Sequence, residues 1–325
     1  MSPPATTCRS AVPMALAAAM DEDDSVIVLG EDVGVAGGVF KTTLGLFERF
    51  GPTRVRDTPI SEQAFVGAAL GAALTGLRPV VEVMFADFAG VCFDQIANQL
   101  AKYRFMSGGQ FAVPVTIRLA NGAGGGFGAQ HSQAAENWFL NIPGLKIVAP
   151  STVADTYGLL LSAVRDDNPV LVFEHKNLLG VKGERPTEAV PLGSAAVVRS
   201  GSDLTLVASQ VMRHRATAVA AGLADEGIDI EVIDPRTLVP FDDATVLASL
   251  RKTSRLLVAE EGPADGSWGA SLISRIATTA FDALDAPPVL ISSPATPVPY
   301  ARTLEDAWVP SEERLADACR KLVRF

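Results

Sequence analysis

Short apolar runs alternate with longer helix-forming runs along most of this chain. The short runs are rich in valine, isoleucine and leucine, as buried strands are, whereas the longer runs are rich in alanine. Such alternation is typical of an α/β fold, in which a parallel sheet carries helices on both faces. In the first half the runs are 26–30, 64–77, 80–85, 88–103, 113–119, 146–149, 153–164 and 170–173.

The pattern stops between residues 176 and 192, where the sequence becomes polar and contains Gly and Pro, and then it resumes. Because 325 residues exceed the usual size of one core, we expect two α/β domains with this stretch between them. The runs of the second half are 204–208, 216–224, 230–233, 245–250, 256–259, 270–280 and 289–292, with a last amphipathic helix at 311–323.

The apolar segment 11–20 near the N-terminus resembles the core of a secretory signal, but it contains Pro13 and runs directly into four acidic residues. We therefore interpret it as a helix that starts at Pro13. No apolar run reaches the ~20 residues of a membrane span, so no membrane partner is expected.

Composition narrows the function classes further. A hydrophobic content of 48% with 20% charged residues is typical of a well-packed globular protein. The net charge of −10 argues against nucleic acid as a partner, because phosphate binding needs clustered Lys and Arg. Cys8, Cys92 and Cys319 have no metal or dithiol spacing, which favours a reducing, cytoplasmic location.

Glu62 stands where a turn containing Pro59 and Ser61 leads into the alanine-rich run 64–77. These signals place Glu62 near a helix N-terminus. An ordinary capping role is one interpretation, since acids near Ser or Thr are favoured there. A carboxylate with a chemical role is the other.

A glycine-rich loop at 121–133 follows the predicted strand 113–119, at the strand end where α/β sheets bind ligands. Gly124, Gly126 and Ala129 match the dinucleotide spacing G-x-G-x-x-A, but no acid lies about 20 residues further on, and the Lys of a phosphate P-loop is absent. His131 in this loop is either a hydrogen-bonded structural side chain or, beside Glu62 in one domain, an acid, base or transition-state donor.

Two further positions carry polar groups in apolar surroundings. Glu82 lies in the strand-like run 80–85, on the same face as Met84, and a buried carboxylate there needs a partner. Most simply, Glu82 makes a structural hydrogen bond. The segment 163–169 ends a helix with several oxygen donors, which suit a hard cation or simply a solvated helix end.

Six motifs then appear in a recognisable order. They are Gly-Glu-Asp-Val-Gly at 30–34, Asp-Thr-Pro-Ile-Ser-Glu at 57–62, Phe-Asp-Gln-Ile at 93–96, Gln-His-Ser-Gln at 130–133, Pro-Gly-Leu-Lys at 143–146 and Pro-Val-Pro-Tyr at 297–300. With them the chain resembles, over essentially its full length, the beta subunit of thiamine-diphosphate-dependent 2-oxo acid dehydrogenases. Segments 83–95 and 173–176 are most similar to acetoin dehydrogenase beta subunits, with pyruvate and branched-chain members close.

The resemblance implies a transketolase-like pyrimidine-binding domain at 1–182, a linker at 183–194 and a transketolase C-terminal domain at 195–325. It implies that Glu62 hydrogen-bonds the aminopyrimidine ring of thiamine diphosphate, favouring the imino form that removes the thiazolium C2 proton. His131 would stabilise or protonate intermediates and assist transfer to a lipoyl group. The aminopyrimidine pocket would be formed by Ile60, Met84 and Phe88.

The same comparison implies a structural potassium ion, held mostly by backbone carbonyls. Its surroundings would be Val115, Ala163, Val164, Asp166 and Asn168. The chain lacks the Gly-Asp-Gly and downstream Asn with which these enzymes hold magnesium and the pyrophosphate. A separate alpha subunit would supply them in an α2β2 heterotetramer, and a lipoyl-bearing acyltransferase core would receive the acyl group.

Two positions depart from the family pattern: Ser271 replaces a common glutamate and Leu179 a common tyrosine. The expected function is decarboxylation of a 2-oxo acid, or cleavage of acetoin, with acyl transfer to lipoamide. The alternatives are a non-catalytic assembly subunit and a carboligating thiamine enzyme of a biosynthetic pathway. Motifs leave the substrate open, because selectivity depends on the substrate pocket.

Overall fold

A computed structural model describes residues 5–325, which divide into two compact units. The first unit contains residues up to Asn121 together with Trp138–Leu192, and the second contains Gly122–Asn137 together with Gly193–Phe325. The glycine-rich loop therefore belongs to the second unit, although it lies inside the first half of the sequence.

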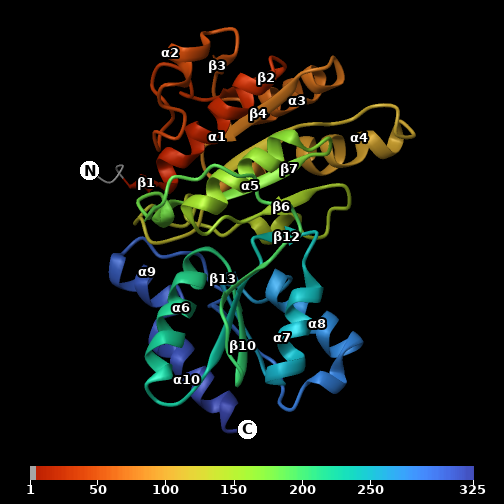
Figure 1. Cartoon of the computed structure of the whole chain (residues 1–325). Helices are drawn as coiled ribbons and strands as arrows, with labels where there is room; N and C mark the ends of the chain where they lie inside the picture. The colour runs from red at the N-terminus through yellow and green to blue at the C-terminus, as the bar shows by residue number, and fades with distance from the viewer. Residues whose placement is uncertain (1–4) are drawn as a thin grey trace. The chain divides into compact units, whose positions relative to one another are not determined.

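The first unit is an α/β structure (Figure 1). Its elements are β1 (Thr6–Thr7), α1 (Cys8–Glu22), β2 (Val26–Gly30), α2 (Leu46–Phe50), β3 (Val55–Asp57), α3 (Glu62–Leu74), β4 (Arg78–Val83), η1 (Ala86–Gly90), η2 (Gln95–Leu100), α4 (Ala101–Met106), β5 (Thr116–Asn121), β6 (Lys146–Val148), α5 (Val153–Arg165), β7 (Val170–His175), η4 (Lys176–Leu178) and β8 (Lys182–Gly183), with η3 (Glu136–Phe139) at the border of the units.

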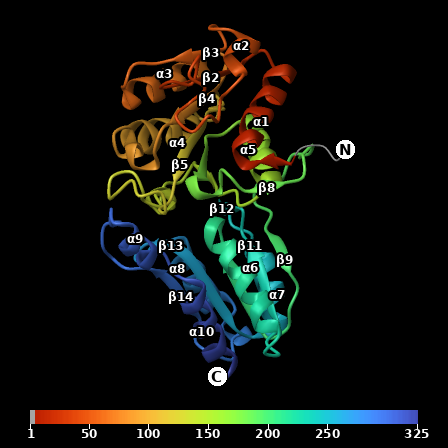
Figure 2. The same ribbon diagram turned by 90° about the vertical axis from the view of Figure 1, so that its left-hand side faces the viewer.

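Six strands of this unit form a parallel sheet in the order β6-β7-β5-β4-β2-β3. Nearly all of their residues are buried, as expected for a sheet covered on both sides. Figure 2 shows α1 and α5 on one side of the strands and α3 and α4 on the other. One core joins α1 and α5 to valines of the sheet. The predicted parallel sheet with helices on both faces is confirmed.

Two local predictions for the first unit are wrong. The first helix begins at Cys8, not at Pro13, because Thr7 and Ser10 form a reciprocal capping box that starts it earlier. The run 88–103 is not one regular helix: it contains the 3₁₀ turn η1, the π-helical turn η2 and the short helix α4. At η2 the side chain of Gln95 lies close to the backbone of Gly67 in α3, where an added Cβ would be 3.1 Å from Gln95 Oε1.

The second unit is also an α/β structure. Its elements are β9 (Ala196–Arg199), β10 (Leu204–Ala208), α6 (Gln210–Ala224), β11 (Ile230–Asp234), β12 (Thr237–Val239), α7 (Asp243–Thr253), β13 (Leu256–Pro263), α8 (Trp268–Thr279), η5 (Phe281–Ala283), β14 (Val289–Ser293), α9 (Arg302–Trp308) and α10 (Glu312–Val323).

Five strands of the second unit form a sheet in the order β14-β13-β10-β11-β9. All neighbours are parallel except β9, an antiparallel edge strand that the apolar pattern did not reveal. The last helix, α10, agrees with its prediction: Ser311 caps it, acids occupy its first turn, and Arg320 and Lys321 occupy its last turn. Among residues 5–325 no helix is long and apolar enough to cross a membrane.

Candidate active site

Glu62 is the first residue of α3 and is buried. Its neighbour Ser61 makes no capping hydrogen bond; the Ser61 hydroxyl donates to the carbonyl of Pro59 at 3.1 Å. Within residues 5–325, no hydrogen bond or ion pair engages the Glu62 carboxylate. The capping interpretation therefore lacks its hydrogen bonds, and a buried acid is left with acceptor capacity for a ligand.

A second buried carboxyl, Glu31, lies beside Glu62. Glu31 follows the end of β2, and its Oε1 has no hydrogen-bond partner among the described residues. Burial, and then the nearby carboxyls of Glu62 and Asp32, raises the pKa of Glu31. Burial, followed by the charge of Glu62, also raises the pKa of the Cys92 thiol to about 12. This part of the first unit thus favours neutral acids.

Glu62 faces an open hollow of about 600 Å³ on the first unit. The hollow is lined by Ser61, Glu62, Gln63, Ala64, Gly67, Val91 and Gln95. Small residues along α3 leave this space beside the carboxylate. Ile60, in the turn before α3, is 84% exposed. The N-terminus of α3 therefore offers an acid, an accessible apolar side chain and room for a ring.

Met84 and Phe88 follow β4. Met84 is half-buried and lines a small cavity together with Glu82, as their shared strand face predicts. Phe88, in η1, packs edge-on against Phe85 with ring centroids 5.5 Å apart. Both residues lie in the same unit as Glu62, but neither lines the hollow beside it.

Glu82 does have a partner, as predicted, and the partner is Arg118 of β5. The Arg118 guanidinium donates to Glu82 at 2.7 Å and, with two nitrogens, to Glu174 of β7 at 2.7 and 2.8 Å. Thr42 also donates to Glu82, at 3.1 Å. The two carboxylates raise the pKa of Arg118 against the effect of burial, and burial raises the pKa of Glu174. A buried Glu–Arg–Glu triad therefore ties β4, β5 and β7 together.

His131 is half-buried in the glycine-rich loop of the second unit. The loop packs with C-terminal residues, so His131 and Glu62 lie in different compact units of the structure. The amides of Gly124 and Gly126 donate to Glu305 at 2.7 and 3.0 Å, and the amide of Ala123 donates to Glu261 at 2.5 Å. The loop amides that a dinucleotide phosphate needs are thus already occupied.

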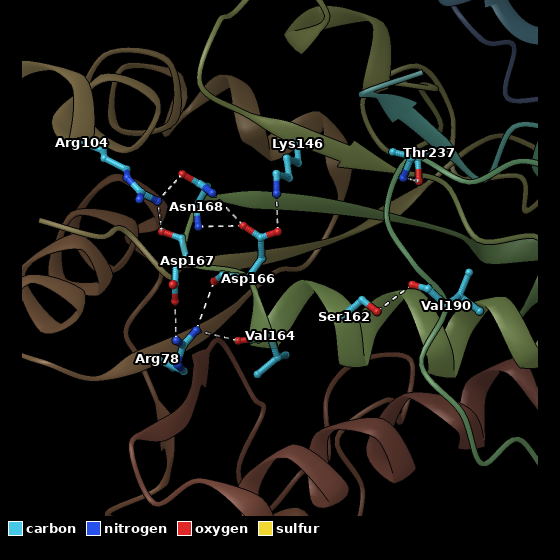
Figure 3. A network of polar contacts seen from close by, with 11 residues as sticks. Arg78, Arg104, Lys146, Ser162, Val164, Asp166, Asp167, Asn168, Val190 and Thr237 are labelled. Atoms are coloured by element: carbon cyan, nitrogen blue, oxygen red, sulfur yellow. Dashed lines mark hydrogen bonds and ion pairs between the residues drawn. The ribbon is translucent and has the colours of Figure 1, made fainter. Parts of the chain in front are cut away.

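Figure 3 shows the corner at the end of α5 where oxygen donors gather. One Arg78 nitrogen donates to the carbonyls of Val164 and Asp166 at 3.3 and 3.2 Å, and Lys146 pairs with the Asp166 carboxylate. Arg104 donates to the side chain of Asn168 at 2.8 Å.

The other two oxygens of the predicted cation site are also hydrogen-bonded. The carbonyl of Val115 accepts from the amide of Val170, and that of Ala163 from the amide of Asp166. Each carbonyl retains a second lone pair. Among residues 5–325, no cluster of three or more His, Cys, Asp or Glu side chains could hold a metal ion.

Sequence reasoning missed Glu31, Arg118 and Glu305. Glu31 stands directly after an apolar strand, and Arg118 interrupts the apolar run 113–119, so each carried a local signal. Glu305 carried none, because its partners lie 179 and 181 residues earlier in the chain.

Comparison with known proteins agrees with this architecture. Residues 5–182 match the family of the transketolase pyrimidine binding domain, and residues 193–315 match the transketolase C-terminal domain. A split gene transketolase, solved as an inactive beta4 tetramer, superposes with a TM-score of 0.80 at 24% identity over 98% of both chains, which shows the same fold.

Two kinds of curated relative are similar over nearly the whole chain. The acetoin:2,6-dichlorophenolindophenol oxidoreductase subunit beta of Cupriavidus necator is 49% identical over 94% of both chains, and that of Bacillus subtilis is 44% identical over 96% of both. The pyruvate dehydrogenase E1 component subunit beta of Rickettsia conorii is 44% identical over 98% of both.

Proposed function

Because this chain belongs to the family of thiamine-diphosphate-dependent acetoin and pyruvate dehydrogenase beta subunits, we propose that it supplies the pyrimidine-binding half of such an active site. The reaction is cleavage of acetoin or decarboxylation of a 2-oxo acid, with the acyl unit passed to lipoamide. The similarity to acetoin-oxidising relatives at up to 49% identity favours acetoin.

One observation carries this proposal: Glu62 is a buried carboxyl beside a hollow and lacks a hydrogen-bond partner within residues 5–325. An aminopyrimidine ring fits that need, because a ring nitrogen bonded to Glu62 would satisfy the orphaned carboxyl. Glu31, a second buried carboxyl with a raised pKa, lies beside this position.

Thiamine diphosphate, when bound, supplies the carbon nucleophile that attacks the substrate carbonyl. The chain's own side chains then have distinct tasks. Glu62 holds and returns the proton at the ring nitrogen, while Ile60, Met84 and Phe88 form the apolar wall that orients the ring and keeps water away. His131 donates a hydrogen bond or a proton to the substrate oxygen, a task suited to imidazole near neutral pH.

The remaining parts of the enzyme are proposed to lie on other chains. An alpha subunit in an α2β2 assembly would hold magnesium and the pyrophosphate, as the beta-subunit relatives suggest. A lipoyl-bearing acyltransferase would accept the acyl group. The three buried, unpaired cysteines suit a reducing cytoplasm.

The proposal also includes a structural potassium ion at the end of α5. Carbonyls at the C-terminal end of α5 present the negative end of a helix, and the Asp166 carboxylate, which is paired with Lys146, adds further oxygens. The second lone pairs of the Val115, Ala163 and Val164 carbonyls support a weakly bound monovalent cation beside Arg78, together with the Asp166 and Asn168 groups.

The test is the Glu62→Gln variant, purified with its alpha subunit and assayed with acetoin and with 2-oxo acids. We expect assembly to be retained and turnover to fall by at least about 100-fold, because glutamine cannot exchange the proton. Glu48→Gln, an exposed acid in the first turn of α2, is the matched control and should be silent. Near-normal turnover of Glu62→Gln would sink the proposal.

A further inference from the structure

The glycine-rich loop of the second unit is held by a carboxylate in place of a ligand. Gly122, Gly124, Gly126 and Gly128 all have positive φ, between 69° and 98°. Backbone in such conformations turns successive amides toward one side and forms a concavity that binds anions. Here the anion is internal, because both oxygens of the Glu305 carboxylate accept loop amides, from Gly124 at 2.7 Å and from Gly126 at 3.0 Å.

Glu305 is fully buried, and so its carboxylate depends on these amides. Charge-assisted hydrogen bonds of this kind are stronger than neutral ones, and a buried charge is costly without them. The same hydrogen bonds stabilise the loop, because they give its amides a fixed acceptor away from water. A second carboxylate, Glu261 of β13, holds the preceding amide of Ala123.

The segment that carries Glu305 is itself fixed. Glu305 lies in α9, and Trp308 of the same helix donates from its indole nitrogen to the carbonyl of Thr296 at 3.1 Å. Tyr300 lies against Gly128, where an added Cβ would be 3.2 Å from the Tyr300 ring. Residues 296–308 therefore form a support for both halves of the loop.

His131 follows directly on this anchored stretch. Its amide donates to the carbonyl of Gly128 at 3.3 Å, and the amide of Gly122 donates to the carbonyl of Gln133 at 3.2 Å, which closes the loop around the histidine. His131 is thus bonded to Gly128, which lies two residues after Gly126, the second glycine that Glu305 holds.

We propose that Glu305 is a positioning residue for His131: its carboxylate occupies the anion-binding concavity of the glycine-rich loop and so fixes the backbone that carries the histidine. This inference rests on the catalytic role of His131 in the proposed function. Because a displacement of about 1 Å in a catalytic group costs up to about 100-fold in rate, loss of the clamp has a measurable cost.

The perturbation is Glu305→Gln in the assembled enzyme with its alpha subunit. Glutamine keeps the shape but turns an amide donor toward loop donors, so one of the two hydrogen bonds is lost. We expect kcat to fall about 10- to 100-fold with thiamine diphosphate affinity unchanged, and the Gly124 and Gly126 amides to exchange with solvent at least about tenfold faster. Asp306→Asn, an exposed neighbour paired with Arg302, is the matched control.

A double-mutant cycle with His131→Ala gives the decisive result. If Glu305 acts through His131, adding Glu305→Gln to His131→Ala lowers kcat less than twofold further. Two results overturn this inference but not the proposed function. One is that Glu305→Gln lowers kcat as much in the His131→Ala variant as in the wild type. The other is that Glu305→Gln has the same rate as Asp306→Asn. A near-normal rate of His131→Ala overturns the proposed role of His131 and the inference together. Should Glu305→Gln not assemble, Glu305→Asp, which keeps the charge, takes its place in the cycle.

Discussion

Removing Arg118 is the sharpest test of how the first unit is held together. The guanidinium makes three hydrogen bonds of 2.7–2.8 Å to Glu82 and Glu174, and all three side chains are buried. Arg118→Met keeps most of the volume but leaves two carboxylates together without a cation. Breaking a buried ion pair in this way costs about 3–5 kcal/mol.

For a unit of this size the loss corresponds to a fall in Tm of about 6–20 °C, at 2–4 °C per kcal/mol. The loss should also depend on pH. Burial already raises the pKa of Glu174, and Arg118 is the group that opposes this rise, so without Arg118 the stability contributed by neutral Glu174 is present at low pH and lost as the pH rises through its folded pKa. Arg118→Met should therefore be closest to wild type near pH 5 and furthest from it near pH 8.

The assay is thermal and urea unfolding of the assembled protein at matched concentration from pH 5 to 8. Arg165→Met is the control: its ion pair with Glu22 is about half exposed, and such pairs contribute about 0–1 kcal/mol. The triple variant Glu82→Gln, Arg118→Met, Glu174→Gln removes every charge and should recover much of the loss. A Tm for Arg118→Met within about 2 °C of Arg165→Met, at all pH values, would refute the reasoning.

Two further predictions concern other parts of the chain. Glu260 is buried in β13, and burial raises its pKa from 4.5 to about 8. As the pH rises from 4.5 to about 8, the second unit should therefore lose up to about 1.4 kcal/mol of stability per pH unit. Glu260→Gln should flatten that slope in urea unfolding; an unchanged slope would show that another group titrates. Replacing potassium by choline should lower the Tm of the complex, and the fall should grow with the potassium concentration that is replaced. If that concentration was 100 times the Kd, the complex loses about 2.7 kcal/mol of stability. A Tm indifferent to the cation argues against the potassium site at Asp166.

The sequence predicted the two α/β layers because their signals are local. The run 64–77 appears as α3 (Glu62–Leu74), since its alanines favour a helix and Ser61 lies at its start. The need of Glu82 for a partner also followed from burial alone. That the partner is Arg118 did not follow, because strand pairing between β4 and β5 decides it.

The candidate site was predictable only in part. Glu62 carried its own signal at a helix start, but the position of His131 depends on carboxylates 138 to 181 residues further along the chain. No window of sequence around 121–133 contains that information. Adjacency in sequence therefore does not show which residues the loop packs against, and the chemistry inferred for His131 stays a prediction.

The clamp on the glycine-rich loop has a consequence for the order in which the chain can fold. The amide of Gly126 and its acceptor, Glu305, are 179 residues apart. At 5–20 residues per second the ribosome adds Glu305 roughly 10–35 s after Gly126. Throughout that interval the loop's anion-binding amides have been synthesised and their carboxylate has not. A fragment that starts at residue 193 faces the reverse situation, since it contains Glu261 and Glu305 but none of the amides they bind. The second unit is therefore completed late in synthesis, and it cannot be isolated intact by a single cut in the chain.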